Sequence, residues 1–102
     1  MHYKLFPHQL FNIKELLQTS NLKLLKIDGN IYFGQMEKKK KNGKGIYITK
    51  EGRLFEGYFY DNEKYGPCVE IYENGNLYLG EFLNNKKHGK GKFYWFSLNT
   101  NS

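Results

Sequence analysis

The chain has 102 residues, which suits a single small domain. Aromatic residues make up 18% of it, and the formal net charge is +6. This aromatic content excludes wholesale disorder, and no apolar run is long enough for a transmembrane helix. The single cysteine, Cys68, excludes an intramolecular disulfide and a cysteine-rich metal cluster, which is typical of a reducing compartment.

Residues 1–21 differ in pattern from the rest of the chain. Pro7 suits the first turn of a helix. Apolar residues then recur at helical spacing, at Leu10, Ile13, Leu16 and Leu17. We therefore expect an amphipathic helix of about ten to twelve residues, which either caps one end of the fold or docks on another protein. The segment lacks a secretory signal and contains no Arg, so we expect a cytoplasmic location, with mitochondrial import as a secondary alternative.

From residue 30 onward the sequence repeats with a period of 23 residues. When residues 30–52, 53–75 and 76–98 are written as rows, aromatic residues and glycines fall in the same columns. A fixed period in this range indicates a repeat architecture. Each row predicts two strands, and residues 22–27 match the last strand of a truncated leading row. The first strands are expected at 31–36, 54–59 and 77–82, and the second strands at 46–49, 69–72 and 92–96.

The connections follow from the turn residues. Asp28-Gly29 is a strong signal for a two-residue hairpin, and glycines at the same phase in Glu51-Gly52 and Asn74-Gly75 predict tight turns between rows. Within rows we expect longer loops, near residues 37–44, 60–67 and 83–90. The sequence therefore predicts a mainly-β fold, an elongated single-layer antiparallel β-meander of seven strands. It would span residues 22–96 and be followed by a tail at residues 97–102.

The recurrent glycines need a physical reason, because glycine weakens the interior of a strand. Glycines two residues after the first aromatic of each row share its face of the sheet, where a neighbouring ring could lie flat across the backbone. Tyr47 and Phe93 are the expected donors of such rings. The glycines of the second column are expected to supply positive φ in loops. The residues assigned to the repeat framework are Tyr32, Gly34, Gly43, Gly45, Phe55, Gly57, Gly66, Tyr78, Gly80, Gly89 and Gly91.

The rows resemble MORN repeats (membrane occupation and recognition nexus), whose pattern is Y-x-G-x-[WF] followed by H-G-x-G and an aromatic residue. The first element matches residues 32–36, 55–59 and 78–82, and the second matches residues 42–45, 65–68 and 88–91. Met36, Cys68 and Glu70 depart from the pattern. The resemblance covers residues 24–96. It implies an elongated, twisted single sheet and a scaffold or interaction protein, often at cytoskeletal structures such as cilia or at membranes.

No constellation of residues predicts catalysis. The three histidines, His2, His8 and His88, are scattered, and none has a metal-ligand spacing. Gly43-Lys44-Gly45 lacks the strand–loop–helix context of a phosphate-binding loop. We therefore expect no enzymatic activity, no cofactor and no metal site.

Exposed rings are the strongest candidates for contacts with a partner. The last predicted strand is almost wholly aromatic and has no protecting residues, so its open edge favours strand addition or ring packing by another protein. Folding of residues 97–102 over this strand is the alternative. The predicted contact residues are Phe33, Tyr58, Phe93, Tyr94, Trp95 and Phe96.

Lysines are expected to gather along one long edge of the sheet, in the loops within rows. This basic strip consists of Lys38, Lys39, Lys40, Lys41, Lys86 and Lys87. Three functions fit these features. The first is a structural or scaffold subunit that binds other proteins in a larger assembly, and the second is a peripheral adaptor that binds anionic phospholipids. The third is a nucleic-acid binder, and a plain solvated edge is the alternative to all binding.

Overall fold

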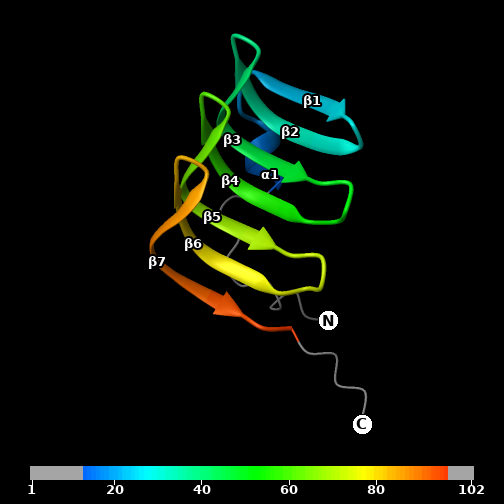
Figure 1. The fold of residues 1–102 in the computed structure, drawn as a ribbon. Coiled ribbons are helices and arrows are strands. Elements are labelled where there is room, and N and C mark those ends of the chain that lie inside the picture. Colours follow the sequence, from blue (N-terminus) through cyan, green and yellow to red (C-terminus); the bar gives the residue numbers. More distant parts are fainter. Residues whose placement is uncertain (1–12, 97–102) are drawn as a thin grey trace.

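The structure, a computed structural model, describes residues 13–96. It consists of one antiparallel sheet of seven strands, with a short helix. Each strand pairs with the next one along the chain, as Figure 1 shows. The predicted mainly-β, single-sheet meander is therefore confirmed. The elements are α1 (Ile13–Leu17), β1 (Leu22–Ile27), β2 (Asn30–Glu37), β3 (Lys40–Ile48), β4 (Leu54–Tyr60), β5 (Glu63–Ile71), β6 (Leu77–Leu83) and β7 (Lys86–Tyr94).

The connections within rows are two-residue turns, so the prediction of longer loops there is wrong. The turn residues are Lys38-Lys39, Asp61-Asn62 and Asn84-Asn85, and all six have positive φ. Two successive positive φ values define the hairpin turn whose twist matches that of the strands, and Asn and Asp adopt it readily. As a result, the second strand of each row begins about six residues earlier than predicted. These turns form the hairpin tips.

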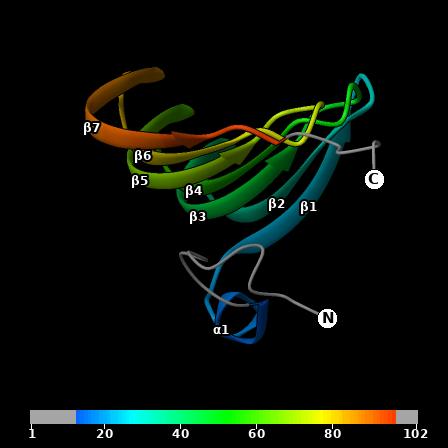
Figure 2. The ribbon, with the colours of Figure 1, turned by 90° about the horizontal axis from the view of Figure 1, so that it is seen from below.

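The second column of glycines has positive φ, as predicted, but these glycines lie inside strands. Gly43, Gly66 and Gly89 belong to β3, β5 and β7, next to shifts in the register of pairing. Such bulges bend a strand and increase its twist. The sheet is accordingly bent into a trough, which Figure 2 shows end-on.

The turns between rows lie on the side of the sheet opposite the hairpin tips (Figure 1). Asp28 and Gly29 form a two-residue turn with positive φ, as predicted. The other two turns have three residues, 50–52 and 73–75, because the Thr49 N–H donates to the Arg53 carbonyl and the Tyr72 N–H to the Asn76 carbonyl, each at 2.8 Å. Each turn closes with a glycine N–H. Gly52 donates to the Thr49 carbonyl at 2.9 Å, and Gly75 donates to the Tyr72 carbonyl at 2.9 Å.

The core lies on one face of the sheet, inside the bend. Its buried rings pack edge to face along the array, with centroid distances of 5.4 Å for Tyr32–Phe59, 5.5 Å for Phe55–Phe82 and 6.0 Å for Tyr78–Phe82. This geometry is the favourable one for aromatic pairs. Each row therefore contributes rings to one continuous core, which consists of Tyr32, Phe55, Phe59, Cys68, Tyr78 and Phe82.

The glycines do allow rings to lie close to the backbone, but these rings are not, as was predicted, those of Tyr47 and Phe93. The ring of Tyr32 leans along its own strand, and its hydroxyl donates to the Gln35 carbonyl at 2.7 Å. A Cβ built at Gly45 would lie 2.5 Å from that ring. The prediction assumed a ring from the neighbouring strand, whereas the framework aromatic of each row itself crosses the glycines.

The opposite face is aliphatic and lies outside the bend. Ile31, Ile48 and Leu54 stand in register on it, because directly paired residues share a face. The short helix α1 lies on this outer side (Figure 2), at the level of β3 and β4 in Figure 1, and buries Leu16 completely. Most of the predicted N-terminal helix and the predicted tail at residues 97–102 lie outside the described residues.

Candidate functional site

Four consecutive aromatic side chains are exposed where β7 ends: Phe93 and Tyr94 are its last two residues, and Trp95 and Phe96 follow it. Their exposed fractions are 40% for Phe93, 44% for Tyr94, 78% for Trp95 and 58% for Phe96. The ring centroids of Phe93 and Trp95 are 4.6 Å apart, and the ring of Tyr72 lies 5.6 Å from that of Phe93. We call these four residues with Tyr72 the aromatic end. The sequence did not predict Tyr72 as a contact residue, because its position beside Phe93 depends on strand pairing between two rows.

The aromatic end is held in position by the preceding turn. The backbone N–H of Phe96 donates to Asn76 Oδ1 at 2.8 Å, and the Phe96 ring lies against Gly75. Within the described sheet, β7 pairs with β6 alone and forms its edge. Such an edge presents backbone donors and acceptors to an incoming strand.

The six predicted contact rings do not form one surface. Phe93 stands in register with Tyr78, on the core side, whereas Tyr94 stands in register with Leu77 on the aliphatic side. Phe33 and Tyr58 are half-buried and also belong to the aliphatic side, within earlier rows. The structure therefore brings Phe93 and Trp95 together beside Tyr72, places Tyr94 on the other face, and separates Phe33 and Tyr58 from this group.

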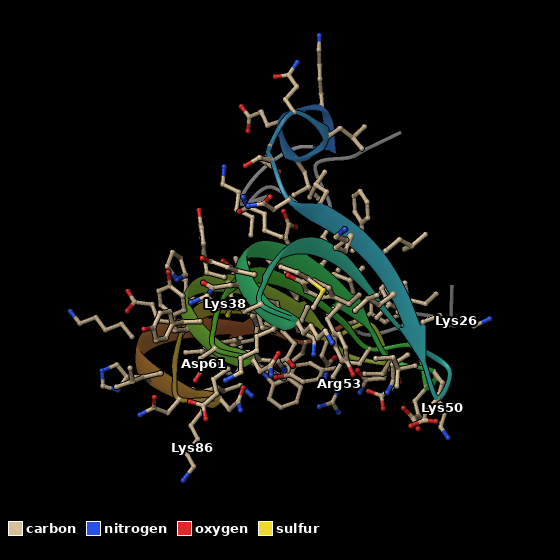
Figure 3. The ribbon with its side chains drawn as sticks, turned by 90° about the horizontal axis from the view of Figure 1, so that it is seen from above. Lys26, Lys38, Lys50, Arg53, Asp61 and Lys86 are labelled. Atoms are coloured by element: carbon tan, nitrogen blue, oxygen red, sulfur yellow. The ribbon has the colours of Figure 1, made fainter. Side chains whose placement is uncertain are left out.

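The predicted basic strip divides into two groups. Lys38, Lys39, Lys40 and Lys86 are exposed at the hairpin tips. Figure 3 shows Lys38, Asp61 and Lys86 along one edge of the sheet. Asp61 forms an ion pair with Lys40 at 2.7 Å, so the second tip interrupts the positive charge. The hydrogen bond between the Lys40 ammonium group and Asp61 raises the pKa of Lys40.

The second group faces the core. Lys41 and Lys87 pair with core-side residues of the preceding strands, and Lys64 occupies the equivalent position in the middle row. Their ammonium groups lie over aromatic rings, at 5.3 Å from Tyr47 for Lys41 and at 4.7 Å from Phe55 for Lys64. Cation–π attraction favours this placement. We call Lys41, Lys64 and Lys87 the lysine row. The sequence could have identified Lys64, because it lies 23 residues after Lys41 and 23 residues before Lys87.

Glu70 is the buried carboxylate of the core side, where the other rows have an aromatic residue. It is 3% exposed, lies 3.8 Å from Lys64 Nζ and 3.6 Å from Lys87 Nζ, and accepts a hydrogen bond from the Tyr72 hydroxyl at 3.0 Å. Burial lowers the pKa of Lys64. Burial also acts on Lys87, but its hydrogen bond with Tyr72 and the charge of Glu70 outweigh burial and raise its pKa.

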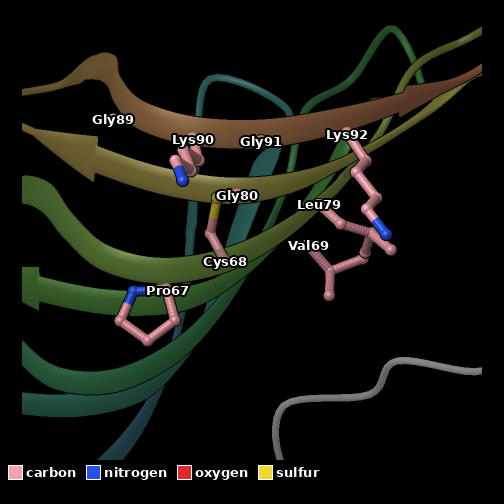
Figure 4. A pocket seen from close by; sticks show the side chains of 9 residues that line it. All are labelled: Pro67, Cys68, Val69, Leu79, Gly80, Gly89, Lys90, Gly91 and Lys92. Carbon is pink, nitrogen blue, oxygen red and sulfur yellow. The ribbon is translucent and has the colours of Figure 1, made fainter.

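Among residues 13–96, neither the cysteine nor a metal-ligand cluster offers a catalytic arrangement. Burial raises the pKa of the Cys68 thiol to about 12, so the thiolate needed for nucleophilic attack is disfavoured. No group of three His, Cys, Asp or Glu residues within residues 13–96 is placed to hold a metal ion. A hollow of about 750 Å³, open and mostly apolar, lies between Cys68, Val69, Leu79 and Lys92 (Figure 4).

The repeat geometry agrees with the comparison against known families. The family described as MORN repeat matches residues 32–52, 55–77 and 78–100, which together cover most of the chain. The chain belongs to the MORN-repeat family. MORN repeats are a non-catalytic repeat type, found in proteins that interact with proteins or membranes. A comparison with the curated proteins gives no significant match. Among the described residues, no helix has the length and hydrophobicity needed to span a bilayer.

Proposed function

We propose that this MORN-repeat protein is a non-enzymatic scaffold, a structural subunit that binds a partner protein in a larger assembly. Cytoskeletal structures, including cilia, are the proposed setting, in the cytoplasm. The observation that carries the proposal is the aromatic end, where four consecutive rings are exposed at and directly after the end of the edge strand β7.

The physical argument rests on how protein interfaces gain affinity. Aromatic side chains at the centre of an interface contribute most of its binding energy, and an edge strand adds backbone hydrogen bonds. The Phe93–Trp95 pair and the anchored Phe96 present such rings in a fixed arrangement. A single sheet with one thin core also gains stability when a partner binds the folded state alone.

The test compares capture of proteins from cells by tagged variants of the full chain. Trp95→Ser removes the most exposed ring of the aromatic end, and Tyr60→Ser is the matched control, because Tyr60 is 66% exposed at a hairpin tip. We expect a defined set of proteins to remain bound through washes with high salt and with detergent. Trp95→Ser should lose this set, and Tyr60→Ser should retain it. Equal retention by the Trp95 variant would overturn the proposal.

A membrane role is the second candidate, supported by the exposed Lys38, Lys39 and Lys40 at the first hairpin tip. Each basic residue near an anionic surface contributes about 1 kcal/mol, and salt screens this attraction. Lys38→Gln with Lys39→Gln should then release the protein from phosphatidylserine vesicles, and high salt should do the same. Retention of the protein by the same vesicles at high salt would contradict this candidate.

A further inference from the structure

The lysine row repeats with the period of the sequence and lies inside the bend of the sheet. Lys41, Lys64 and Lys87 are one period apart, and each pairs with the last core-side residue of the preceding strand. The inside of the bend is the core side, as Figure 3 shows for Arg53, whose guanidinium lies 4.8 Å over the Tyr72 ring. The three ammonium groups therefore lie in one row on the core side of the bent sheet, next to the hairpin tips, and we call this side the trough.

These ammonium groups already lie over aromatic rings when no partner is bound. Lys87 Nζ lies 5.1 Å from the Tyr78 ring centroid and 5.4 Å from that of Tyr72, and Lys41 Nζ lies between Tyr32 and Tyr47 at 5.5 and 5.3 Å. A side chain that is already ordered loses less conformational entropy when it binds. The side chain of Lys87 is 48% exposed and that of Lys64 is 24% exposed, so both remain partly accessible to a partner.

The lysine row carries more positive charge than its surroundings neutralise. Glu70 reaches Lys64 and Lys87, at 3.8 and 3.6 Å. Lys41 has no carboxylate within 4 Å among residues 13–96. Three cations thus share one carboxylate, and the trough favours an acidic partner.

The spacing of the row determines the shape of that partner. Successive lysines are two strands apart, which corresponds to about 9.6 Å, because neighbouring strands lie about 4.8 Å apart. Residues seven apart in an α-helix lie on the same face at a distance of about 10.5 Å. In a β-strand, residues two apart are separated by only about 6.7 Å, and residues three apart point to opposite faces.

We propose that the trough docks an amphipathic α-helix of a partner protein, with acidic residues at seven-residue intervals that pair with Lys41, Lys64 and Lys87. The helix would run along the array, across the strands, with its apolar side toward the rings of Tyr72 and Phe93. This inference rests on the proposed function and specifies the chemistry of the partner. A flat bilayer meets the rims of a bent sheet and not the inside of the bend, which favours a protein ligand over a membrane.

The test measures binding of the full-length protein to labelled synthetic helices by fluorescence anisotropy at low salt. The probe is a helix-forming peptide of about 18 residues with glutamates seven residues apart. A second peptide has the same composition, with its glutamates five residues apart and therefore on different faces of the helix. We expect the first peptide to bind at least about tenfold more tightly than the second, a difference set by the register alone.

Substitutions then identify the trough as the site. Lys41→Gln is the cleanest variant, because it leaves the Glu70 ion pairs intact, and it should weaken the first peptide by about threefold to tenfold. The triple variant of the lysine row should weaken it further. The matched control, Lys38→Gln with Lys39→Gln and Lys86→Gln, removes the same charge from exposed tips and should have a smaller effect than the triple variant. Equal losses in the row and tip variants would overturn the inference.

Two further binding experiments distinguish a helical partner from other ligands of the trough. A polyproline-type peptide with a glutamate at every third residue repeats at about 9.3 Å, and tighter binding of this peptide would overturn the helical partner. Binding of phosphatidylserine vesicles that requires Lys41 would assign the trough to a membrane and also overturn it. If neither peptide binds, while the Trp95 variant still loses its captured proteins, this inference fails and the proposed function stands. If capture is also independent of Trp95, both fail.

Discussion

Replacement of Gly45 by alanine tests whether the repeat glycines exist to admit the framework rings. Gly45 has no positive φ, so its backbone accepts alanine without strain. The added Cβ would lie 2.5 Å from Tyr32 Cε1 and Oη and 2.8 Å from Cζ, where ordinary contacts begin at 3.4 Å. The ring would have to move by about 1 Å within a packed core, and overpacking of this kind costs about 1–3 kcal/mol.

Two further contributions adjust this figure. Displacement of the ring breaks the hydrogen bond from Tyr32 to the Gln35 carbonyl, which contributes about 1 kcal/mol. Alanine also lowers the conformational entropy of the unfolded chain, which stabilises the folded state by about 0.4–1 kcal/mol. We therefore expect Gly45→Ala to lower the free energy of unfolding by about 2 kcal/mol. Such a change would shift the urea midpoint by about 1 M.

The assay is urea unfolding followed by far-ultraviolet circular dichroism, in a double-mutant cycle. Tyr32→Leu removes the ring that the new Cβ would meet, so Gly45→Ala should cost less than about 0.5 kcal/mol in that background. A Gly45→Ala variant that unfolds at the wild-type urea concentration would refute the reasoning. So would an equal loss of stability in both backgrounds, because the ring would then not be the cause.

Three other predictions concern the hairpin tips and the core. Asn85→Gly removes the side-chain oxygen that accepts from the Lys64 backbone N–H at 2.8 Å, and it should lower the free energy of unfolding in urea by about 1 kcal/mol. Asn84→Gly is the control and should lower it by less, because Asn84 has positive φ but does not accept from that N–H. Equal losses in the two variants would contradict this. Because the pKa of Cys68 is raised from 9.0 to about 12, its contribution to stability is fully present below pH 9 and is lost as the pH rises toward 12. Cys68→Ala should therefore flatten the alkaline decline in stability, and an unchanged slope would exclude this origin. Asp61→Asn breaks an exposed ion pair and should leave the urea midpoint unchanged, so a clear decrease would show that the tip charges matter.

The sequence predicted the fold well, because the strongest signals were local or periodic. The aromatic and glycine columns placed the first strands, and the Asp28-Gly29 turn was placed correctly. The hairpin tips were predicted wrongly for a physical reason. Stretches rich in lysine and asparagine suggest solvated loops, but in this protein the strands continue to two-residue turns, and Lys41, Lys64 and Lys87 lie over aromatic rings.

The candidate site could be predicted only in part. The exposed rings at residues 93–96 followed from composition and the position of the last strand, and their exposure is observed. The lysine row, the buried Glu70 and the contact of Tyr72 with Phe93 depend on register between rows. Register is set by long-range pairing and by bulges, and one residue of slip would move each of these side chains to the other face.

The most direct test of the central claim is amide hydrogen exchange of this protein, measured alone and in the complex captured from cells. The account predicts that exchange at residues 86–96 slows in the complex, because a partner covers the edge strand and its rings. Unchanged exchange at residues 86–96, with protection confined to the hairpin tips at residues 38–41, would contradict it and would place the partner on the basic tips.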